Sequence, residues 1–317
     1  MDRLIEKIIQ KQNPTCVGLD TRFEYIPPET AEAFGERGDS MESAAKAIFE
    51  YNRLILDAVC DLVPAVKIQV AYYEMYGVHG MKAFYDTARY AEEKGMYVIA
   101  DIKRNDIGAT AEAYAAAYLG QTALNGGSGL AFPADSVTVN GYLGSDGIKP
   151  FADKCFANGK TAFILVKTSN ASSGELQDMM LESGKRVYEQ MADMVQQWGR
   201  GHIGKYGYSS LGAVVGATYP EQGAGLRERI KSVFFLIPGY GAQGGSADGA
   251  AGCFDRSGLG GVVNASRSIL CAYKNPAYAG QTPAQAARSE AQSMQAALHE
   301  AICRKAGISK IGEGAGA

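Results

Sequence analysis

Segments with the length and apolar character of buried strands alternate with segments of helical pattern, and this alternation is the strongest constraint on the fold. Continuous apolar runs of roughly four to eight residues are typical of parallel strands that are buried on both faces. Strand–helix alternation predicts a parallel sheet of the α/β class. Eight such units in 317 residues predict a (β/α)8 TIM barrel with additional N- and C-terminal helices, and a doubly wound open sheet is the alternative. The expected strands are 15–19, 65–70, 97–100, 136–140, 161–167, 211–215, 232–237 and 260–263.

The segments between these strands carry apolar residues at helical spacing, and Pro220 is suited to the first turn of one further helix. No linker rich in Pro, Gly or Ser divides the chain, so we expect a single domain over residues 1–317. Its last six residues, 312–317, are small or polar and are expected to be disordered. The main expected helices are 1–9, 44–62, 78–94, 110–119, 148–156, 176–198 and 283–305.

Composition and charge exclude several classes of partner. The net charge of −3 gives no basic surface for nucleic acid and no polybasic membrane anchor. No apolar run is long enough to span a bilayer, and the N-terminus alternates charged with apolar residues, unlike a signal peptide. The six cysteines form no Cys-x-x-Cys pair and the three histidines match no metal motif. We therefore expect a cytoplasmic protein that has reduced cysteines and no bound metal.

The segment 101–110 carries charges where a buried strand ends. Residues two apart on a strand share a face, so Asp101 and Lys103 are expected to point the same way. Asp106 follows in the next loop, and Lys67 lies within the apolar sequence of the preceding strand. Burying a charge costs several kcal/mol unless it is paired. A functional charge array is therefore a better interpretation than a set of surface salt bridges, which are the usual alternative.

A glycine-rich segment after the seventh expected strand, residues 239–244, has the spacing G-x-G-x-x-G. A dinucleotide fingerprint is rejected because it belongs after the first strand and opens a helix, whereas residues 244–249 are a weak helix start. Barrels often bind phosphate with the loops after strands seven and eight. Ser266 and Arg267 follow the eighth strand, and an arginine can bind phosphate through two hydrogen bonds. These segments together predict a phosphate site, and no Ser–His–Asp or Cys–His set is visible.

The pattern Asp101-x-Lys103-x-x-Asp106-Ile107-Gly108-x-Thr110 resembles the signature of the orotidine 5′-phosphate decarboxylase family. The first part alone is also found in a related sugar-phosphate decarboxylase, but the complete set is specific. The chain length and the Lys167-Thr168-Ser169-Asn170 sequence resemble the longer bacterial branch, although Ala171 stands where proline is expected. Other matching segments, in the family's order, are Val17-Gly18-Leu19-Asp20, Lys67, the sequence from Pro238 to Gly245, and Arg267-Ser268.

The resemblance implies cofactor-independent decarboxylation of orotidine 5′-phosphate to UMP and CO2, the last step of de novo UMP biosynthesis. It implies a homodimer in which Asp106 and Thr110 enter the neighbouring subunit's site. The implied catalytic residues are Lys103, Asp101, Lys67 and Asp106. The implied substrate-binding residues are Asp20 and Lys67 for the ribose, Ser169 for the pyrimidine, and Gln243, Gly244, Ser266 and Arg267 for the phosphate, together with Thr110.

Two other functions remain open at the level of sequence. A metal-dependent sugar-phosphate decarboxylase or aldolase would need a further acidic ligand near Asp101. A barrel that only binds a nucleotide phosphate would be expected to have a broken charge network, whereas all four charged residues are present.

Overall fold

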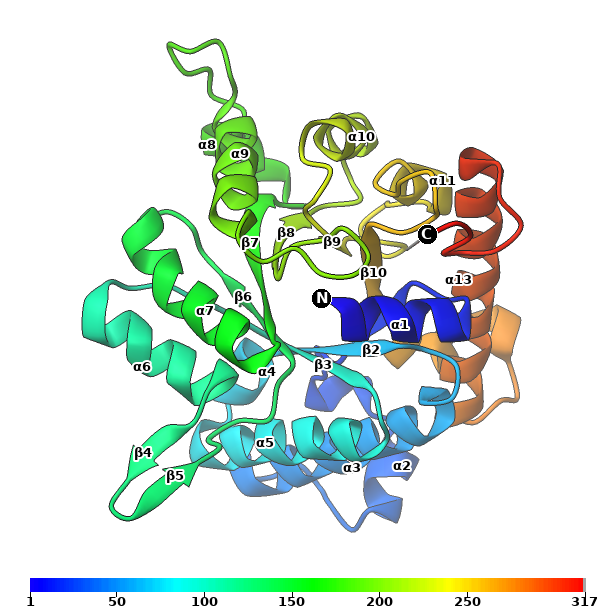
Figure 1. Ribbon diagram of the computed structural model, residues 1–317. Helices are drawn as coiled ribbons and strands as arrows, with labels where there is room; N and C mark the ends of the chain where they lie inside the picture. The colour runs from blue at the N-terminus through cyan, green and yellow to red at the C-terminus, as the bar shows by residue number, and fades with distance from the viewer. Residues whose placement is uncertain (316–317) are drawn as a thin grey trace.

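The computed structural model describes residues 1–315, and in this part of the chain eight parallel strands close into a barrel (Figure 1). Strand β1 (Thr15–Gly18) pairs with β2 (Ala65–Gln69) on one side and with β10 (Gly261–Ala265) on the other. An open sheet has two free edges, so this closure excludes the doubly wound alternative and confirms the TIM barrel. The remaining barrel strands are β3 (Tyr97–Arg104), β6 (Ser136–Val139), β7 (Thr161–Lys167), β8 (Leu211–Val215) and β9 (Phe235–Pro238).

Burial on both faces explains why the strand sequences are continuously apolar. Every residue of β1, β6, β8 and β10 is buried. Inward side chains fill the barrel, and outward side chains pack against the surrounding helices. Polar side chains therefore appear mainly where the strands end, which positions the site described below.

Most of the helices form an outer ring around the barrel, and the N-terminal helix lies across its centre in this view (Figure 1). Their starts follow ordinary capping chemistry: the Ser40 hydroxyl accepts from the Ser43 N–H, and Thr282 and Gln285 form a capping box. The principal helices are α1 (Asp2–Lys11), α3 (Met41–Val59), α5 (Gly77–Glu93), α6 (Gly108–Leu119), α7 (Ser145–Asn158), α9 (Val187–Gly199), α10 (Pro220–Arg229) and α13 (Pro283–Ala306). The shorter ones are α2 (Pro28–Ala33), α4 (Ala71–Glu74), α8 (Gly174–Gln177), α11 (Ala247–Ala251) and α12 (Arg267–Leu270).

The single long helix expected over 176–198 was wrong. The structure has α8, then a turn, and α9 begins only at Val187. In the turn, Met180 and Arg186 form an isolated antiparallel β-bridge. Gly184 has a φ of 77°, a left-handed conformation that an α-helix cannot accommodate. The apolar residues of this turn produce a helical spacing in the sequence that the backbone does not follow.

The structure differs from the sequence-based expectations at two further places, a hairpin and the C-terminal segment. Strands β4 (Thr122–Leu124) and β5 (Gly127–Gly129) form an exposed hairpin that was not expected. Of the segment 312–317 expected to be disordered, residues 312–315 form hydrogen-bonded turns and 316–317 lie outside the described residues. Across residues 1–315, no helix combines the length and the apolar character needed to cross a bilayer.

Candidate active site

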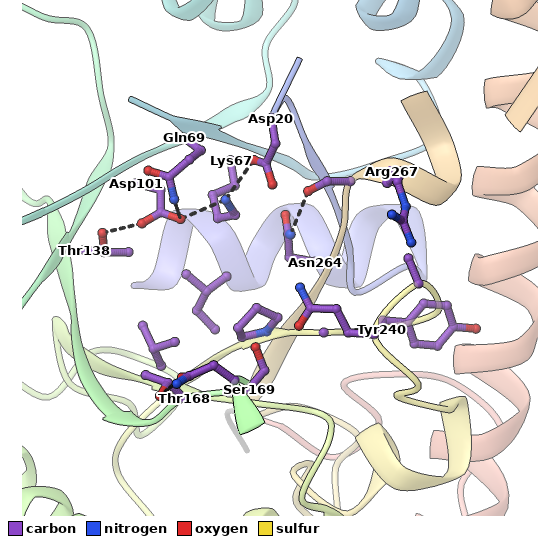
Figure 2. A pocket seen from close by; sticks show the side chains of 18 of the residues that line it. Asp20, Lys67, Gln69, Asp101, Thr138, Thr168, Ser169, Tyr240, Asn264 and Arg267 are labelled. Atoms are coloured by element: carbon purple, nitrogen blue, oxygen red, sulfur yellow. Dashed lines mark hydrogen bonds and ion pairs between the residues drawn. The ribbon is translucent and has the colours of Figure 1, made fainter. Parts of the chain in front are cut away.

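A cavity of about 630 Å³ opens at the carboxyl ends of the barrel strands. In Figure 2 the side chains of Asp20, Lys67 and Asp101 gather on one side of it, and Thr168 and Ser169 face them across the space. Arg267 and Tyr240 lie at a third side. The cavity thus has a charged wall, a polar wall and an end that carries an arginine.

Asp101 is the centre of the charged wall, and only 5% of this residue is exposed. Its Oδ2 accepts from Lys67 Nζ at 2.8 Å and from Gln69 Nε2 at 2.9 Å. Its Oδ1 accepts from Lys103 Nζ at 2.6 Å and from the Thr138 hydroxyl at 2.7 Å. Four donors therefore satisfy a carboxylate that would otherwise be costly to bury.

The charges of this wall stabilise each other. Burial opposes ionisation of Asp101, but Lys67 and Lys103 hold the pKa of its carboxyl well below the usual range. Burial likewise opposes protonation of Lys67, but Asp101 and Asp20 outweigh it and raise the pKa of the ammonium. The second contact, Lys67 Nζ to Asp20 Oδ1, measures 3.2 Å. Lys67 and Asp101 thus stabilise each other's charge at the centre of the alternating sequence Asp20–Lys67–Asp101–Lys103.

Lys103 reaches Asp101 through an unusual backbone conformation. The pairing of β3 with β6 is irregular between Ala100 and Arg104, and Lys103 has a φ of 46°, in the left-handed region. A non-glycine residue rarely adopts this region, and such strain is concentrated at functional sites. The Lys103 side chain is 44 % exposed. Its ammonium is therefore anchored to the charged wall and is still accessible from the cavity.

The loops after β9 and β10, which the sequence predicts to bind phosphate, meet at the end of the cavity that carries Arg267. Gln243, Ser266 and Arg267 line the cavity, whereas Gly244 does not. The Gly244 N–H donates to Gly241 O at 2.8 Å, so it is used within the loop. Gly18 of β1 leaves room for Ser266, because a Cβ there would lie 1.9 Å from the Ser266 hydroxyl.

The comparisons with known proteins agree with this geometry. The model of the family described as "Orotidine 5'-phosphate decarboxylase / HUMPS family" matches residues 15–282. The chain belongs to that family. The orotidine 5′-phosphate decarboxylase of Caldicellulosiruptor bescii is 44% identical over 275 residues, covering 86% of this chain and 90% of that protein. The Clostridium perfringens strain SM101 enzyme of the same name is 40% identical over 303 residues, covering 96% and 99%.

Solved structures support the same family. A crystal structure described as a putative orotidine-monophosphate-decarboxylase from Toxoplasma gondii has a TM-score of 0.77 and 27% sequence identity. It covers 97% of this chain and 98% of its own. A corresponding Streptomyces avermitilis structure has a TM-score of 0.74 and 27% identity, and covers 95% of each chain. The resemblance found in the sequence to this decarboxylase family is therefore confirmed.

The structure brings together most, but not all, of the residues singled out in the sequence. Those that line the cavity are Asp20, Lys67, Asp101, Lys103, Ser169, Gln243, Ser266 and Arg267. Asp106 and Thr110 do not line it. The Asp106 carboxylate accepts from the Ile107 N–H at 2.8 Å, and Thr110 is exposed in the first turn of α6.

Several residues of the cavity were missed in the sequence. Gln69 could have been predicted from the sequence, because it lies two positions after Lys67 on the same strand and therefore points to the same face. A search for polar residues at the strand ends would select Asn140, but its side chain accepts from the Tyr142 N–H. The residue that contacts Asp101 from this strand is Thr138. Asn264 contributes a buried Oδ1 with no hydrogen-bond partner in the described structure.

The groups around Asp101 also bear on the metal-dependent alternative, which needs a second carboxylate beside it. The four groups bonded to Asp101 are two ammonium groups, an amide and a hydroxyl, all of them donors. Within residues 1–315, no three His, Cys, Asp or Glu side chains gather closely enough to hold a metal ion. This arrangement is the one expected for stabilising charge with fixed ammonium groups.

Proposed function

We propose that this protein converts orotidine 5′-phosphate to UMP and CO2 without a cofactor, as the last step of UMP biosynthesis. The observation that carries the proposal is the ammonium of Lys103, held by Asp101 at the edge of a cavity that also contains an arginine-bearing end. Family membership supplies the substrate, since the relatives at 40% and 44% identity carry this enzyme's name.

The reaction breaks the bond between C6 of the pyrimidine and the carboxylate carbon, and the electron pair stays on C6. Lys103 stabilises this developing charge as a fixed cation. Its ammonium then donates a proton to C6, forming the C–H bond of UMP, and regains a proton from solvent. Asp101 holds the ammonium in place through the 2.6 Å contact.

Asp101 has a second effect on the bound substrate. Its carboxylate lies next to the position proposed for the substrate carboxylate. Two like charges about 4 Å apart repel by roughly 4 kcal/mol at an effective dielectric near 20. Departure of CO2 removes this repulsion, which favours the bond-breaking step.

The other walls of the cavity bind the rest of the nucleotide. Asp20 and Lys67 hold the ribose hydroxyls, and Ser169 binds the pyrimidine from the opposite wall. Gln243 and Arg267 bind the phosphate, with Ser266 beside them. Because the phosphate is remote from C6, its binding energy can be used to close the loops over the reacting centre.

The active form is proposed to be a cytoplasmic homodimer in which Asp106 and Thr110 complete the partner's site. Apolar side chains support an interface here, since Ile107 is 54% exposed and Tyr142 is 76% exposed. Leu143 is also exposed, and Gly147 lies close to both Leu143 and the Asp106 backbone. One interface can therefore bury this apolar group and carry Asp106 into the neighbouring site.

The activity is tested by following the loss of orotidine 5′-phosphate absorbance on adding purified protein with EDTA present. Turnover under these conditions is expected, and its absence would refute the proposal. Turnover that appears only when a divalent cation replaces the EDTA would favour the metal-dependent alternative.

Site sharing is tested by mixing inactive Asp101→Ala and Asp106→Ala proteins. Each mixed dimer would have one intact site and one site that lacks both residues, so activity should reappear. No recovery in mixed dimers that have been verified would count against a shared site.

A further inference from the structure

The carboxyl end of β7 holds a lysine that the proposed mechanism does not use. The Lys167 side chain is 0% exposed and does not line the cavity, although Leu165 on the same strand does. The pairing of β7 with β8 is irregular between Leu165 and Lys167, which breaks the alternation of faces. A buried ammonium beside the cavity therefore points away from it.

A carboxylate from the next segment neutralises this ammonium. Lys167 Nζ lies 2.9 Å from Asp178 Oδ1 and 3.0 Å from Asp178 Oδ2, and 3.1 Å from the Ser173 hydroxyl. The ring of Tyr219 lies 4.5 Å from the ammonium and that of Tyr188 lies 5.7 Å from it. Aromatic rings thus cover the ammonium at the base of the loop that joins β7 to α8, whereas the Asp178 side chain is 27% exposed.

That loop, residues 168–173, carries the polar wall of the cavity. Gln177 fixes one end of it, accepting from the Thr168 N–H at 2.9 Å and donating to the Thr168 hydroxyl at 2.8 Å. The Thr218 hydroxyl donates to Ser169 O at 3.2 Å. Ser169, which faces the charged wall in Figure 2, is therefore held directly by Thr218 and, through its neighbour Thr168, by Gln177.

An ion pair is an expensive way to fill a buried space. Apolar residues of similar volume are often as stabilising as a buried pair, or more so, while removing one partner alone is strongly destabilising. What an ion pair supplies, and an apolar pair does not, is a fixed distance and direction between the two segments. Here those segments are the end of β7 and the residues after α8.

We propose that Lys167 and Asp178 are positioning residues that set the placement of Ser169 against the pyrimidine. This inference rests on the proposed function for the identity of the ligand. Neither residue contacts the cavity, so their effect is confined to the base-binding loop and leaves the phosphate end unchanged.

The decisive variant is the double substitution Lys167→Met with Asp178→Leu, which removes both charges and keeps the space filled. We expect its unfolding midpoint to be close to that of the wild-type protein, whereas Asp178→Leu alone is destabilised because it leaves the fully buried Lys167 ammonium without its carboxylate. We also expect kcat/KM for orotidine 5′-phosphate to fall by about 10²-fold, the effect of a misplacement near 1 Å. Lys185→Met is the control, because Lys185 pairs with Asp193 at 2.8 Å and, within residues 1–315, its side chain makes no hydrogen bond to residues 168–173.

Binding of two ligands separates positioning from a general structural role. Ribose 5-phosphate lacks the base, so its dissociation constant, measured by calorimetry, should stay within about twofold of wild type in the double variant. The dissociation constant for UMP should rise about tenfold or more. An equal loss for both ligands, or wild-type kinetics and affinities in the double variant, would overturn the positioning role.

These outcomes are independent of the proposed reaction. A wild-type protein that fails to turn over orotidine 5′-phosphate refutes the proposed function. The ratio of UMP to ribose 5-phosphate affinity then still decides the positioning role, and a ratio unchanged by the double substitution refutes it.

Discussion

Replacing Lys67 by methionine tests the idea that the charged wall is stabilised by its own internal pairing. The Lys67 side chain is 5% exposed, and methionine keeps most of its volume while removing the ammonium, which lies 2.8 Å from Asp101 and 3.2 Å from Asp20. At an effective dielectric of about 20, these contacts are worth roughly 6 and 5 kcal/mol before desolvation. Desolvation offsets much of this, and removing one partner of a buried pair costs about 3–5 kcal/mol.

The structure favours the lower end of that range. Without Lys67, Asp101 still accepts from Lys103, Gln69 and Thr138, and its charge stays partly compensated. We therefore expect Lys67→Met to lose about 3 kcal/mol of unfolding free energy. For a chain of 317 residues the loss corresponds to a fall of roughly 4–5 °C in Tm.

Urea unfolding followed by circular dichroism measures this loss, since the free energy falls linearly with denaturant. Lys82→Met is the control, because Lys82 pairs with Asp86 on the surface and is 74% exposed. An exposed pair contributes about 0–1 kcal/mol. If the two variants lose the same stability, the charged wall is not held by its internal pairing.

The pH dependence of the same difference gives a second check. The depressed pKa of Asp101 stabilises the fold above its unfolded value of about 3.9, and this contribution is lost as pH falls through the folded pKa. The raised pKa of Lys67 stabilises the fold below about 10.4, and this is lost as pH rises through the folded pKa. The stability difference between wild type and Lys67→Met should therefore be constant from about pH 5 to pH 9. A slope within this window would show that one of the two groups titrates there.

Three further substitutions have distinct expected outcomes. Lys103→Ala should abolish turnover of orotidine 5′-phosphate while ribose 5-phosphate still binds, and a fully active variant would remove the role proposed for Lys103. Arg267→Ala, at an exposed residue that lines the cavity, should raise KM by about 10- to 100-fold, from the loss of about 1.5–3 kcal/mol in charge-assisted hydrogen bonding, without changing Tm. Gly18→Ala would place a Cβ 1.9 Å from the present position of the Ser266 hydroxyl, so Ser266 should be displaced. Stability, measured by thermal unfolding, and phosphate affinity, measured by calorimetry, should both fall.

The barrel could be predicted from the sequence because most of its strands are continuous apolar runs, a pattern that depends only on burial. Closure itself, the pairing of β1 with β10, is a contact between distant segments and was inferred from the number of units. The turn between α8 and α9 was missed because apolar spacing cannot reveal that Gly184 has a positive φ.

The contacts of the site also include some that the sequence predicts and some that it does not. The proximity of Asp101 and Lys103 followed from strand periodicity, although the left-handed backbone at Lys103 did not. The partners from other strands, such as Thr138, depend on register between strands, which a single sequence does not specify. The roles of Asp106 and Thr110 in a neighbouring subunit stay a prediction.

The seam between β1 and β10 has a consequence for how the protein is made. Asp20 follows the first strand to leave the ribosome, and Ser266 follows the last, yet both line one cavity. Lys67 and Asp101 are synthesised long before the strand that closes the barrel around them. Until the last strand has been synthesised, the sheet that carries these charges is open and accessible to water. The cavity is therefore complete only after the last strand has been synthesised and has paired with the first.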